Sequence, residues 1–200
     1  MDTKHHHIES GGFQLPAGLI DENVEIFSAN GFLKGIYKGK TFDFNKLPTI
    51  VKIQFVNIYE SEKLETPDCE KLIRKLFHCK NYQSELQQFT MCNYGGLDNA
   101  ADFNKGSIPE KEYWNCGKRG KCKGELIVCK PHCIVKNNIS LREIEIIKLI
   151  SHGLQDNEMA IQLNLADSTI TTHVRNIRKK LKVNNRGEII RFAFNYNIAL

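Results

Sequence analysis

Residues 139–186 read ISLREIEIIKLISHGLQDNEMAIQLNLADSTITTHVRNIRKKLKVNNR and contain the clearest helical periodicity in the chain. Ser140 followed three positions later by Glu143 forms a capping box, which predicts the start of a helix. Gly153 predicts the end of this helix, because glycine readily adopts the left-handed conformation that closes one. The buried face of this first helix is expected at Ile144, Ile147, Leu149 and Ile150. The stretch therefore predicts a helical domain.

Three further helices are expected after this glycine. The second covers 156–164, with inward side chains at Met159, Ala160 and Leu163. Leu165 and Ala166 are expected to form a turn, and Asp167 or Ser168 to cap the third helix. Apolar residues at spacings of four, three and four predict the inner face of the third helix: Ile170, Val174, Ile177 and Leu181. The fourth helix is expected over 186–197, with inward side chains at Ile189, Ile190, Phe192, Ala193 and Phe194.

The outward face of the third helix consists of short polar and basic side chains. Between Ser168 and Lys182 the sequence has five basic residues and no acidic one. Short hydrogen-bonding side chains followed by cations suit a helix in the DNA major groove, where the first turns reach base edges and the later charges reach phosphates. A solvated polar face is the alternative interpretation of the same pattern.

This C-terminal stretch resembles the LuxR-type (GerE-like) helix-turn-helix domain of bacterial transcription regulators over residues 139–198. These residues fall in the register of that family without a gap: Arg142, Glu143, Glu145, Gly153, Glu158, Ala160, Leu163, Thr169, His173, Ile177, Lys180, Leu181, Val183 and Arg186. The resemblance implies a domain that binds double-stranded DNA and whose last helix pairs two copies of the chain on near-palindromic DNA. Phe192, Phe194 and Tyr196 are candidates for this homodimer surface or for the core.

The resemblance also implies individual DNA contacts. Base reading is expected from Thr171, Thr172 and Arg175. Phosphate contacts are expected from Ser168, Thr169, Asn176, Arg178 and Lys179. Many members of the family have lysine where this chain has Thr171. Arg175 therefore becomes the main candidate for sequence specificity, because arginine can bind guanine through two hydrogen bonds.

The composition of the whole chain fits a globular protein. Its 200 residues are 41% hydrophobic, and no run approaches the roughly 18 to 20 apolar residues of a membrane helix. The N-terminus lacks the basic-then-apolar pattern of a signal peptide, so we expect a cytoplasmic protein with no membrane partner. The net charge of +5 is modest, but residues 111–136 have seven basic residues against two acidic ones. This second basic surface also favours a nucleic-acid partner.

The chain divides into three expected regions. Residues 1–12, with three consecutive histidines, are expected to be a leader or tag. Residues 13–136 are expected to form a domain rich in α-helix and cysteine, and residues 137–200 the DNA-binding domain. The boundary is expected near Lys136, where a short polar link precedes the helical pattern. The predicted fold class is therefore mainly α in both domains.

Secondary structure in the first domain is less strongly patterned. Residues up to about 45 predict a weak hairpin or loose extended structure. A helix is expected over 47–63 with Ile50, Ile53 and Val56 inside, and Ile58 and Tyr59 as further candidates. A second helix is expected after Pro67, and a short third one over 84–91. The glycine-rich and asparagine-rich segment that follows predicts a long loop, which needs something to pin it.

Four of the seven cysteines lie close together in sequence, at Cys116, Cys122, Cys129 and Cys133. In a chain without a secretory signal they favour metal or redox chemistry over disulfides. Their spacing contains no tight CxxC pair, so the ligand set stays open. Cys92 stands at the start of the long loop and can pin it at both ends. The segments around Cys92 and Cys116 resemble small bacterial or phage-borne regulators with a LuxR-type C-terminus.

This second resemblance implies a metal-ligand set of Cys92, Cys116, Cys122 and Cys129, with Cys133 or His132 as the rival fourth ligand. A structural zinc ion held by four thiolates is the leading interpretation. Free or buried thiols without metal are one alternative, and a sensory iron–sulfur cluster or redox-active thiol set is another. Cys69 and Cys79 are expected to be buried as small hydrophobic residues.

The leading functional expectation is a DNA-binding transcription regulator whose N-terminal domain is braced by a metal. A metal or redox sensor, with the cysteines as input and DNA as output, is the first alternative. A protein-interaction module that acts on RNA polymerase is the second. An enzyme is not expected, because the sequence has no HExxH, P-loop or nucleophile-elbow motif.

Overall fold

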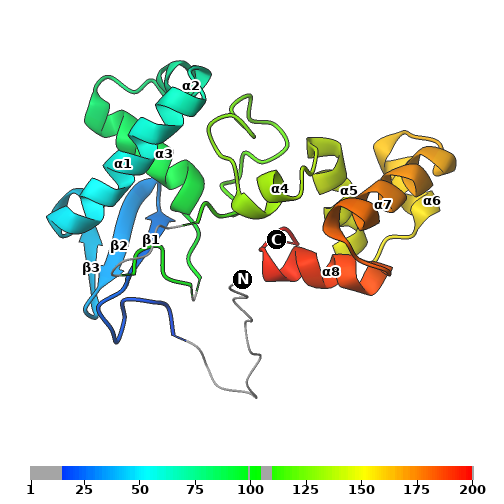
Figure 1. Cartoon of the computed structure of the whole chain (residues 1–200), viewed down its shortest axis with the longest axis horizontal. Helices are drawn as coiled ribbons and strands as arrows, with labels where there is room; N and C mark the ends of the chain where they lie inside the picture. The colour runs from blue at the N-terminus through cyan, green and yellow to red at the C-terminus, as the bar shows by residue number, and fades with distance from the viewer. Residues whose placement is uncertain (1–14, 99, 105–109, 200) are drawn as a thin grey trace.

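The computed structural model describes residues 15–98, 100–104 and 110–199; the expected leader at 1–12 lies outside this part of the chain. In these residues the protein is rich in helix, with eight α-helices and one small sheet of three strands. Figure 1 shows the sheet and the first three helices on one side and the last four helices on the other, with α4 (His132–Lys136) between them. The expectation of a helix-rich chain is confirmed, but the sheet is an addition to it.

The sheet is an antiparallel meander of β1 (Val24–Ala29), β2 (Phe32–Tyr37) and β3 (Lys40–Asp43). Asn30 and Gly31 join the first two strands with positive φ angles of 52° and 78°. This is the backbone conformation that an Asn-Gly hairpin turn favours. The weak hairpin expected among the residues up to about 45 corresponds to β2 and β3, and β1 adds a third strand to it.

Three helices accompany the sheet, α1 (Thr49–Glu65), α2 (Asp68–Phe77) and α3 (Tyr82–Tyr94). The predicted inner face of α1 is wrong, because Ile50 and Ile53 are 63% and 47% exposed. The buried face of α1 consists instead of Val51, Phe55, Tyr59 and Glu62. Phe55 packs edge-on against Phe44 and Tyr94, at ring-centroid distances of 5.8 and 5.2 Å. Aromatic packing against Phe44 and Tyr94 thus outweighs the aliphatic stripe that the periodicity favoured.

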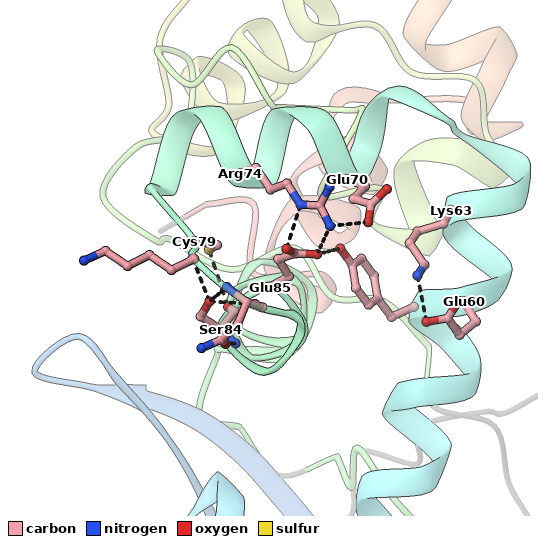
Figure 2. A network of polar contacts seen from close by, with 10 residues as sticks. Glu60, Lys63, Glu70, Arg74, Cys79, Ser84 and Glu85 are labelled. Atoms are coloured by element: carbon pink, nitrogen blue, oxygen red, sulfur yellow. Dashed lines mark hydrogen bonds and ion pairs between the residues drawn. The ribbon is translucent and has the colours of Figure 1, made fainter.

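One arginine joins α2 to α3 (Figure 2). The Arg74 Nε donates to Glu85 Oε1 at 2.7 Å, and its Nη2 donates to Glu70 Oε1 at 2.8 Å. The Tyr59 hydroxyl donates to the other oxygen of Glu85 at 3.3 Å, which adds α1 to the same network. Because Glu85 is almost fully buried, this pairing satisfies a charge that would otherwise destabilise the helices.

Helix α3 is longer than the predicted 84–91, because Asn81 and Ser84 form a capping box at its start. The half-buried Cys79 lies near this junction, and its thiol contacts the carbonyl oxygen of Ser84 at 3.5 Å (Figure 2), whereas Cys69 is buried at the start of α2. Both residues therefore pack as small side chains.

The segment from Gly95 to Pro131 contains no described helix and contributes to two separate cores. Phe103 and Val128 pack into the core between the sheet and α1–α3. Tyr113, Cys133 and Ile134 instead pack into the core of the last four helices. The domain boundary near Lys136 stays a prediction, but the C-terminal core includes side chains from before it.

The last four helices are α5 (Leu141–Ser151), α6 (Asp156–Leu163), α7 (Asp167–Leu181) and α8 (Arg186–Asn195), as the periodicity predicted. The capping box of Ser140 and Glu143 is confirmed, and Gly153 has the expected positive φ of 87°. The prediction that Asp167 or Ser168 caps α7 is wrong, because Ala166 is the cap residue and no side chain caps this helix.

Two inner-face assignments in these helices also change. Ile146 is fully buried and Leu149 only partly, so the buried face of α5 is shifted from the predicted one. Helix α8 ends two residues early and Phe194 is 59% exposed, whereas Phe192 packs against Tyr196 at 4.9 Å between ring centroids. In the described ranges, every helix is too short or too polar to cross a lipid bilayer.

Candidate nucleic-acid interface and the cysteine cavity

Helices α6 and α7 meet at a tight left-handed turn. Asn164 ends α6 with φ 51° and ψ 53°, and the Leu165 amide then donates to the carbonyl oxygen of Ala160 at 2.9 Å. Ala160 is 3% exposed, and its small side chain lets the two helices cross closely. This turn sets the direction in which α7 leaves the domain.

Helix α7 has one buried face and one exposed face. Ile170, Val174 and Ile177 are buried, as the spacing predicted. The predicted DNA-contacting residues lie on the exposed side or at its edge: Ser168, Thr171, Thr172, Arg175, Asn176 and Lys179 are exposed, and Thr169 and Arg178 are half-buried. The structure thus brings the whole predicted set onto one helix face, while each role stays a prediction.

Two of the predicted base-reading side chains use their hydroxyl groups within the helix. Thr171 Oγ1 donates to the carbonyl oxygen of Asp167 at 3.0 Å, and Thr172 Oγ1 donates to that of Ser168 at 2.9 Å. A hydroxyl whose proton is already donated offers a ligand only its lone pairs and the neighbouring methyl group. These threonines therefore present acceptors and methyl groups to a groove.

The basic residues of α7 have different environments. Lys180 forms an ion pair with Glu143 at 2.6 Å and so joins α7 to α5. Arg178 has a buried Nε with no hydrogen-bond partner among the described residues. A lysine that neutralises a buried carboxylate serves the fold, whereas an arginine with an unused donor has capacity for an anion. The sequence alone could not distinguish the role of Lys180 from that of Arg178.

Two arginines outside α7 hold α6 at its ends. Arg142 donates to the carbonyl oxygen of Leu163 at 3.0 Å, at the C-terminal end of α6. Arg186 pairs with Asp156 at 2.7 Å and donates to the carbonyl oxygen of Leu154, at the N-terminal end. Because charged hydrogen bonds fix both ends of α6, the geometry of the turn to α7 is rigidly specified.

The four predicted metal ligands line one cavity of about 550 Å³ in the N-terminal part of the molecule. Cys92 comes from α3, and the other three come from the segment after it: Cys116, Cys122 and Cys129. The Trp114 indole, which also lines the cavity, donates to the carbonyl oxygen of Cys92 at 3.3 Å. No three of the four sulfur atoms lie within 4.8 Å of one another, whereas tetrahedral zinc brings its thiolates closer together than that.

Arg119 lies beside these thiols with a side chain that is only 4% exposed. Its Nη1 is 3.3 Å from the Cys129 sulfur and 3.5 Å from Glu125 Oε1, and its Nη2 has no hydrogen-bond partner among the described residues. Burial, and then the neighbouring thiols, raise the pKa of Cys92 to about 12, although an amide hydrogen bond from Gln88 acts in the opposite direction. The sequence had not singled out Arg119 among its basic neighbours.

The rival fourth ligands lie elsewhere. Cys133 is 4% exposed and packs in the C-terminal core, and burial raises its pKa to about 12. His132 is exposed and lines a different cavity, together with Lys111 and Lys130. The placement of Cys92 in the shared cavity therefore favours it over both rivals.

One group of potential ligands was not expected from the sequence. Glu25, Asp102 and Glu112 place one carboxylate oxygen each within 4.8 Å of the others. They come from positions far apart in the chain, with no spacing motif that links them. No sequence signal could have found them, because only the pairing of β1 with the segment around Phe103 brings them together.

A close crossing of two helices at a left-handed turn, with a polar exposed face on the second helix, defines the helix-turn-helix class of DNA-binding domains. The family described as bacterial regulatory proteins, luxR family, matches residues 137–193. This part of the chain is a luxR-family helix-turn-helix domain.

The same region is similar to several curated proteins. Response regulator protein VraR from Staphylococcus aureus, Staphylococcus saprophyticus and Staphylococcus epidermidis is 39% identical to it over 57 residues. The match covers 28% of this chain and 27% of each relative. The chain therefore spans about a quarter of the length of these relatives, and its first 136 residues lie outside the family match. No solved structure matches the chain.

Proposed function

We propose that this protein is a sequence-specific transcription regulator that lays α7 in the major groove of double-stranded DNA. The observation that carries this proposal is the exposed polar face of α7 within a luxR-family helix-turn-helix domain. Because Ile170, Val174 and Ile177 bury the opposite face, α7 is held with its polar side outward.

Arg175 is proposed as the main base-reading residue. It is exposed, and its guanidinium makes no hydrogen bond or ion pair in the described part of the chain. Thr171 and Thr172 donate their hydroxyl protons to the helix backbone, so they suit a thymine methyl or a donor group on a base. Of these three side chains, that of Arg175 is the one with free hydrogen-bond donors for guanine.

Phosphate contacts are proposed for Ser168, Thr169, Asn176, Arg178 and Lys179. Arg178 lies half-buried at the edge of the exposed face of α7. Such contacts fix the position of a protein on the duplex and depend on salt, because each one releases a counterion.

Binding of variants to selected and to random DNA tests the proposal. Arg175→Ala should lose about 1–3 kcal/mol of preference for the selected site. Lys179→Ala should weaken binding to both DNAs and reduce the salt slope by about 1. Lys71→Ala, on the exposed surface of α2, is the control and should change neither. An equal loss on both DNAs for Arg175→Ala would contradict a base-reading role.

A structural zinc ion held by Cys92, Cys116, Cys122 and Cys129 is proposed for the N-terminal part. It is supported by the shared cavity and by Arg119, whose positive charge beside Cys129 would favour thiolates. Zinc binding would require the sulfur atoms to approach one another, and the exposed segment 115–121 has two glycines at positive φ that allow such a movement, Gly117 and Gly120.

Elemental analysis of the purified chain tests this site. One zinc per chain is expected, and Cys92→Ser should remove it, whereas Cys79→Ser, a half-buried cysteine outside the cavity, should keep it. Iron with visible absorbance would instead support an iron–sulfur cluster. Full metal content in both variants would contradict the proposed ligand set.

A metal or redox sensor is the second candidate, and a stack of side chains favours it. The Arg119 guanidinium lies 4.3 Å from the centre of the Tyr113 ring, and Lys148 Nζ lies 5.7 Å from the same ring. Arg119 contacts the cysteine cavity and Lys148 belongs to α5. Oxidation or metal loss should then change DNA affinity in the wild type, and less so in Tyr113→Leu. DNA binding that does not depend on the oxidation or metal content of the cysteines would exclude the sensor and leave only a structural role for the metal.

A homodimer on DNA is proposed through the exposed end of α8, where Phe194 is 59% and Tyr196 46% exposed. Exposed aromatic side chains at the end of a helix suit an apolar contact between copies. Phe194→Ala should weaken cooperative binding to a palindromic site but leave binding to a half-site unchanged. Contact with RNA polymerase and a cytoplasmic location stay predictions.

A further inference from the structure

Three carboxyl groups converge where three separate segments of the N-terminal part meet. Glu25 belongs to β1, and Asp102 precedes Phe103, whose amide and carbonyl groups both pair with Val24 at 3.0 and 2.9 Å. Glu112 belongs to a third segment, which is held by a bond from its amide to the Asn93 carbonyl oxygen at 2.8 Å. One oxygen from each carboxyl group lies within 4.8 Å of the other two.

These acids are removed from water and from positive charge. Glu25 is 0% exposed and Asp102 4% exposed, and Glu112 is largely buried. None of the ion pairs found in the described residues includes any of the three. Like charges this close in a poorly solvated place cannot all persist without a proton or a cation to neutralise them.

The backbone orients each carboxyl group and leaves ligand capacity unused. The amide of Asp98 donates to Glu25 Oε1 at 2.8 Å, that of Ile26 to Asp102 Oδ2 at 2.6 Å, and that of Gly96 to Glu112 Oε2 at 3.2 Å. Glu25 Oε2 is fully buried and has no hydrogen-bond partner among the described residues. Carboxylates held by outer hydrogen bonds, with a free oxygen in a closed cluster, are the arrangement found around bound cations.

We propose that Glu25, Asp102 and Glu112 bind one divalent cation that prefers oxygen ligands, such as Ca²⁺ or Mn²⁺. Mg²⁺ fits less well, because it gives up its water shell reluctantly and this place is nearly closed to solvent. The site is separate from the cysteine cavity, whose thiols select softer metals. Its cation pins the glycine-rich segment after α3 to β1 and so supplies a constraint that a long loop requires.

Protons compete with the cation for these groups. Burial raises the pKa of Glu25 to about 9 and that of Glu112 to about 7. The charge of Asp98 also raises both pKa values, whereas a hydrogen bond with the Asp102 side chain lowers that of Glu112. Because the cation must displace these protons, its affinity rises with pH. This dependence separates the carboxyl cluster from exposed acidic groups, which are ionised throughout the neutral range.

Calorimetric titration of the full chain with CaCl₂, MnCl₂ and MgCl₂ at pH 6 and pH 8, after treatment with a chelator, tests the proposal. One Ca²⁺ or Mn²⁺ per chain is expected, with affinity at least tenfold higher at pH 8. The midpoint of thermal unfolding should rise by several degrees at saturation. The absence of a response to all three ions at millimolar concentration at pH 8 would overturn the proposal and leave a cluster that shares protons.

Variants locate the binding. Glu25→Gln and Asp102→Asn should each reduce the affinity at least tenfold, whereas Glu65→Gln, at an exposed position on α1, should not. Each cluster variant also removes one of three repelling groups, so the cation-free variants should unfold no more easily than the wild type at pH 8. Unchanged affinity in both cluster variants would place the ion elsewhere and overturn the assignment. If one variant fails to fold, the other and the wild-type titration decide.

Discussion

A buried acid in the C-terminal half and a cluster of acids in the N-terminal half are treated in opposite ways. In the C-terminal half, Glu143 lies between Lys180 and the start of α5, and hydrogen bonds from both lower its pKa despite its burial. In the N-terminal half, Glu25, Asp102 and Glu112 gather without a cationic side chain, and their pKa values are raised. The protein thus neutralises Glu143 with Lys180, as it neutralises Glu85 with Arg74, whereas the carboxyl cluster is arranged for something that binds to it.

Buried polar atoms without partners occur in both halves. Three buried side-chain atoms in the described residues lack a hydrogen-bond partner: Glu25 Oε2, Arg119 Nη2 and Arg178 Nε. Buried polar atoms are normally satisfied, so each of these needs an explanation. The first lies in the carboxyl cluster, the second beside the cysteine cavity and the third on α7. All three mark places where a ligand has been proposed above.

The largest expected effect tests whether the halves are separable. Phe55→Ala should lower the free energy of unfolding of the N-terminal core by about 3–5 kcal/mol, because it removes a fully buried ring. Urea unfolding followed by the fluorescence of Trp114, the one tryptophan of the chain, measures this. Phe32→Ala, at a residue 68% exposed, is the control and should cost less than about 0.5 kcal/mol.

Hydrogen exchange on the Phe55→Ala variant extends this test. Amide protection should fall less in α7 than in α3, because only a few side chains join the two cores. An equal loss of protection in both helices would mean that the two halves unfold as one unit, and it would contradict their separation.

A smaller effect is expected in the C-terminal half. Glu143→Ala should cost about 2–3 kcal/mol, because it removes both the capping box of α5 and the partner of Lys180. Glu145→Ala, which breaks a surface pair with Arg142, should cost less than about 1 kcal/mol. Chemical denaturation compares the two variants. Similar losses of unfolding free energy would show that the buried ion pair stabilises the protein no more than the surface pair does.

The pH responses of the halves should have opposite signs. The pKa of Glu112 is raised from its ordinary 4.5 to about 7, so in cation-free protein its stabilising contribution is present below about pH 4.5 and lost as pH rises through 7. The pKa of Glu143 is lowered, so its contribution is present above its ordinary pKa and lost as the solution becomes more acidic.

Hydrogen exchange at pH 5 and pH 8, corrected for intrinsic rates, measures both responses. Protection of β1 should fall by roughly 2 kcal/mol toward pH 8, whereas protection of α5 should not fall. Glu112→Gln should reduce the response of β1, and the part that remains comes from Glu25, whose pKa is also raised. A β1 that becomes more stable toward pH 8 in the absence of a cation would contradict the assignment of charge in the cluster.

The smallest effect concerns local backbone conformation. Gly153 has φ 87°, and a Cβ placed there would meet no atom within 4 Å, so Gly153→Ala should cost only the backbone strain, about 1 kcal/mol. Gly187→Ala in the first turn of α8, where φ is not positive, should leave stability unchanged or raise it slightly. Thermal unfolding compares the two, and a loss above about 3 kcal/mol at Gly153 would indicate a packing role.

The sequence predicted the C-terminal half well because its structure is local. A capping box, a glycine and apolar spacings fix α5 to α8 within short stretches, and the exposed face of α7 follows from its buried one. The exposure of Phe194 was not predicted, because it depends on the last turn of α8, which no neighbouring element covers in the described residues.

The N-terminal half was predicted less well because its decisive contacts are remote in sequence. The inner face of α1 depends on aromatic rings from Phe44 and Tyr94, which no local pattern reveals. The carboxyl cluster likewise depends on the pairing of Val24 with Phe103. The set of four cysteines that shares a cavity came from a resemblance, since spacing alone left Cys92 and Cys133 as equals.

The C-terminal core also has a consequence for how the protein is made. Tyr113, Cys133 and Ile134 pack against α5 to α8, yet they leave the ribosome before any of these helices. During synthesis their apolar surface must stay exposed until the residues that follow α8 have emerged, since Ile198 belongs to the same core. A chain that stops short of its final residues should therefore be recognised by chaperones and proteases along its middle segment and should not reach DNA as a folded fragment.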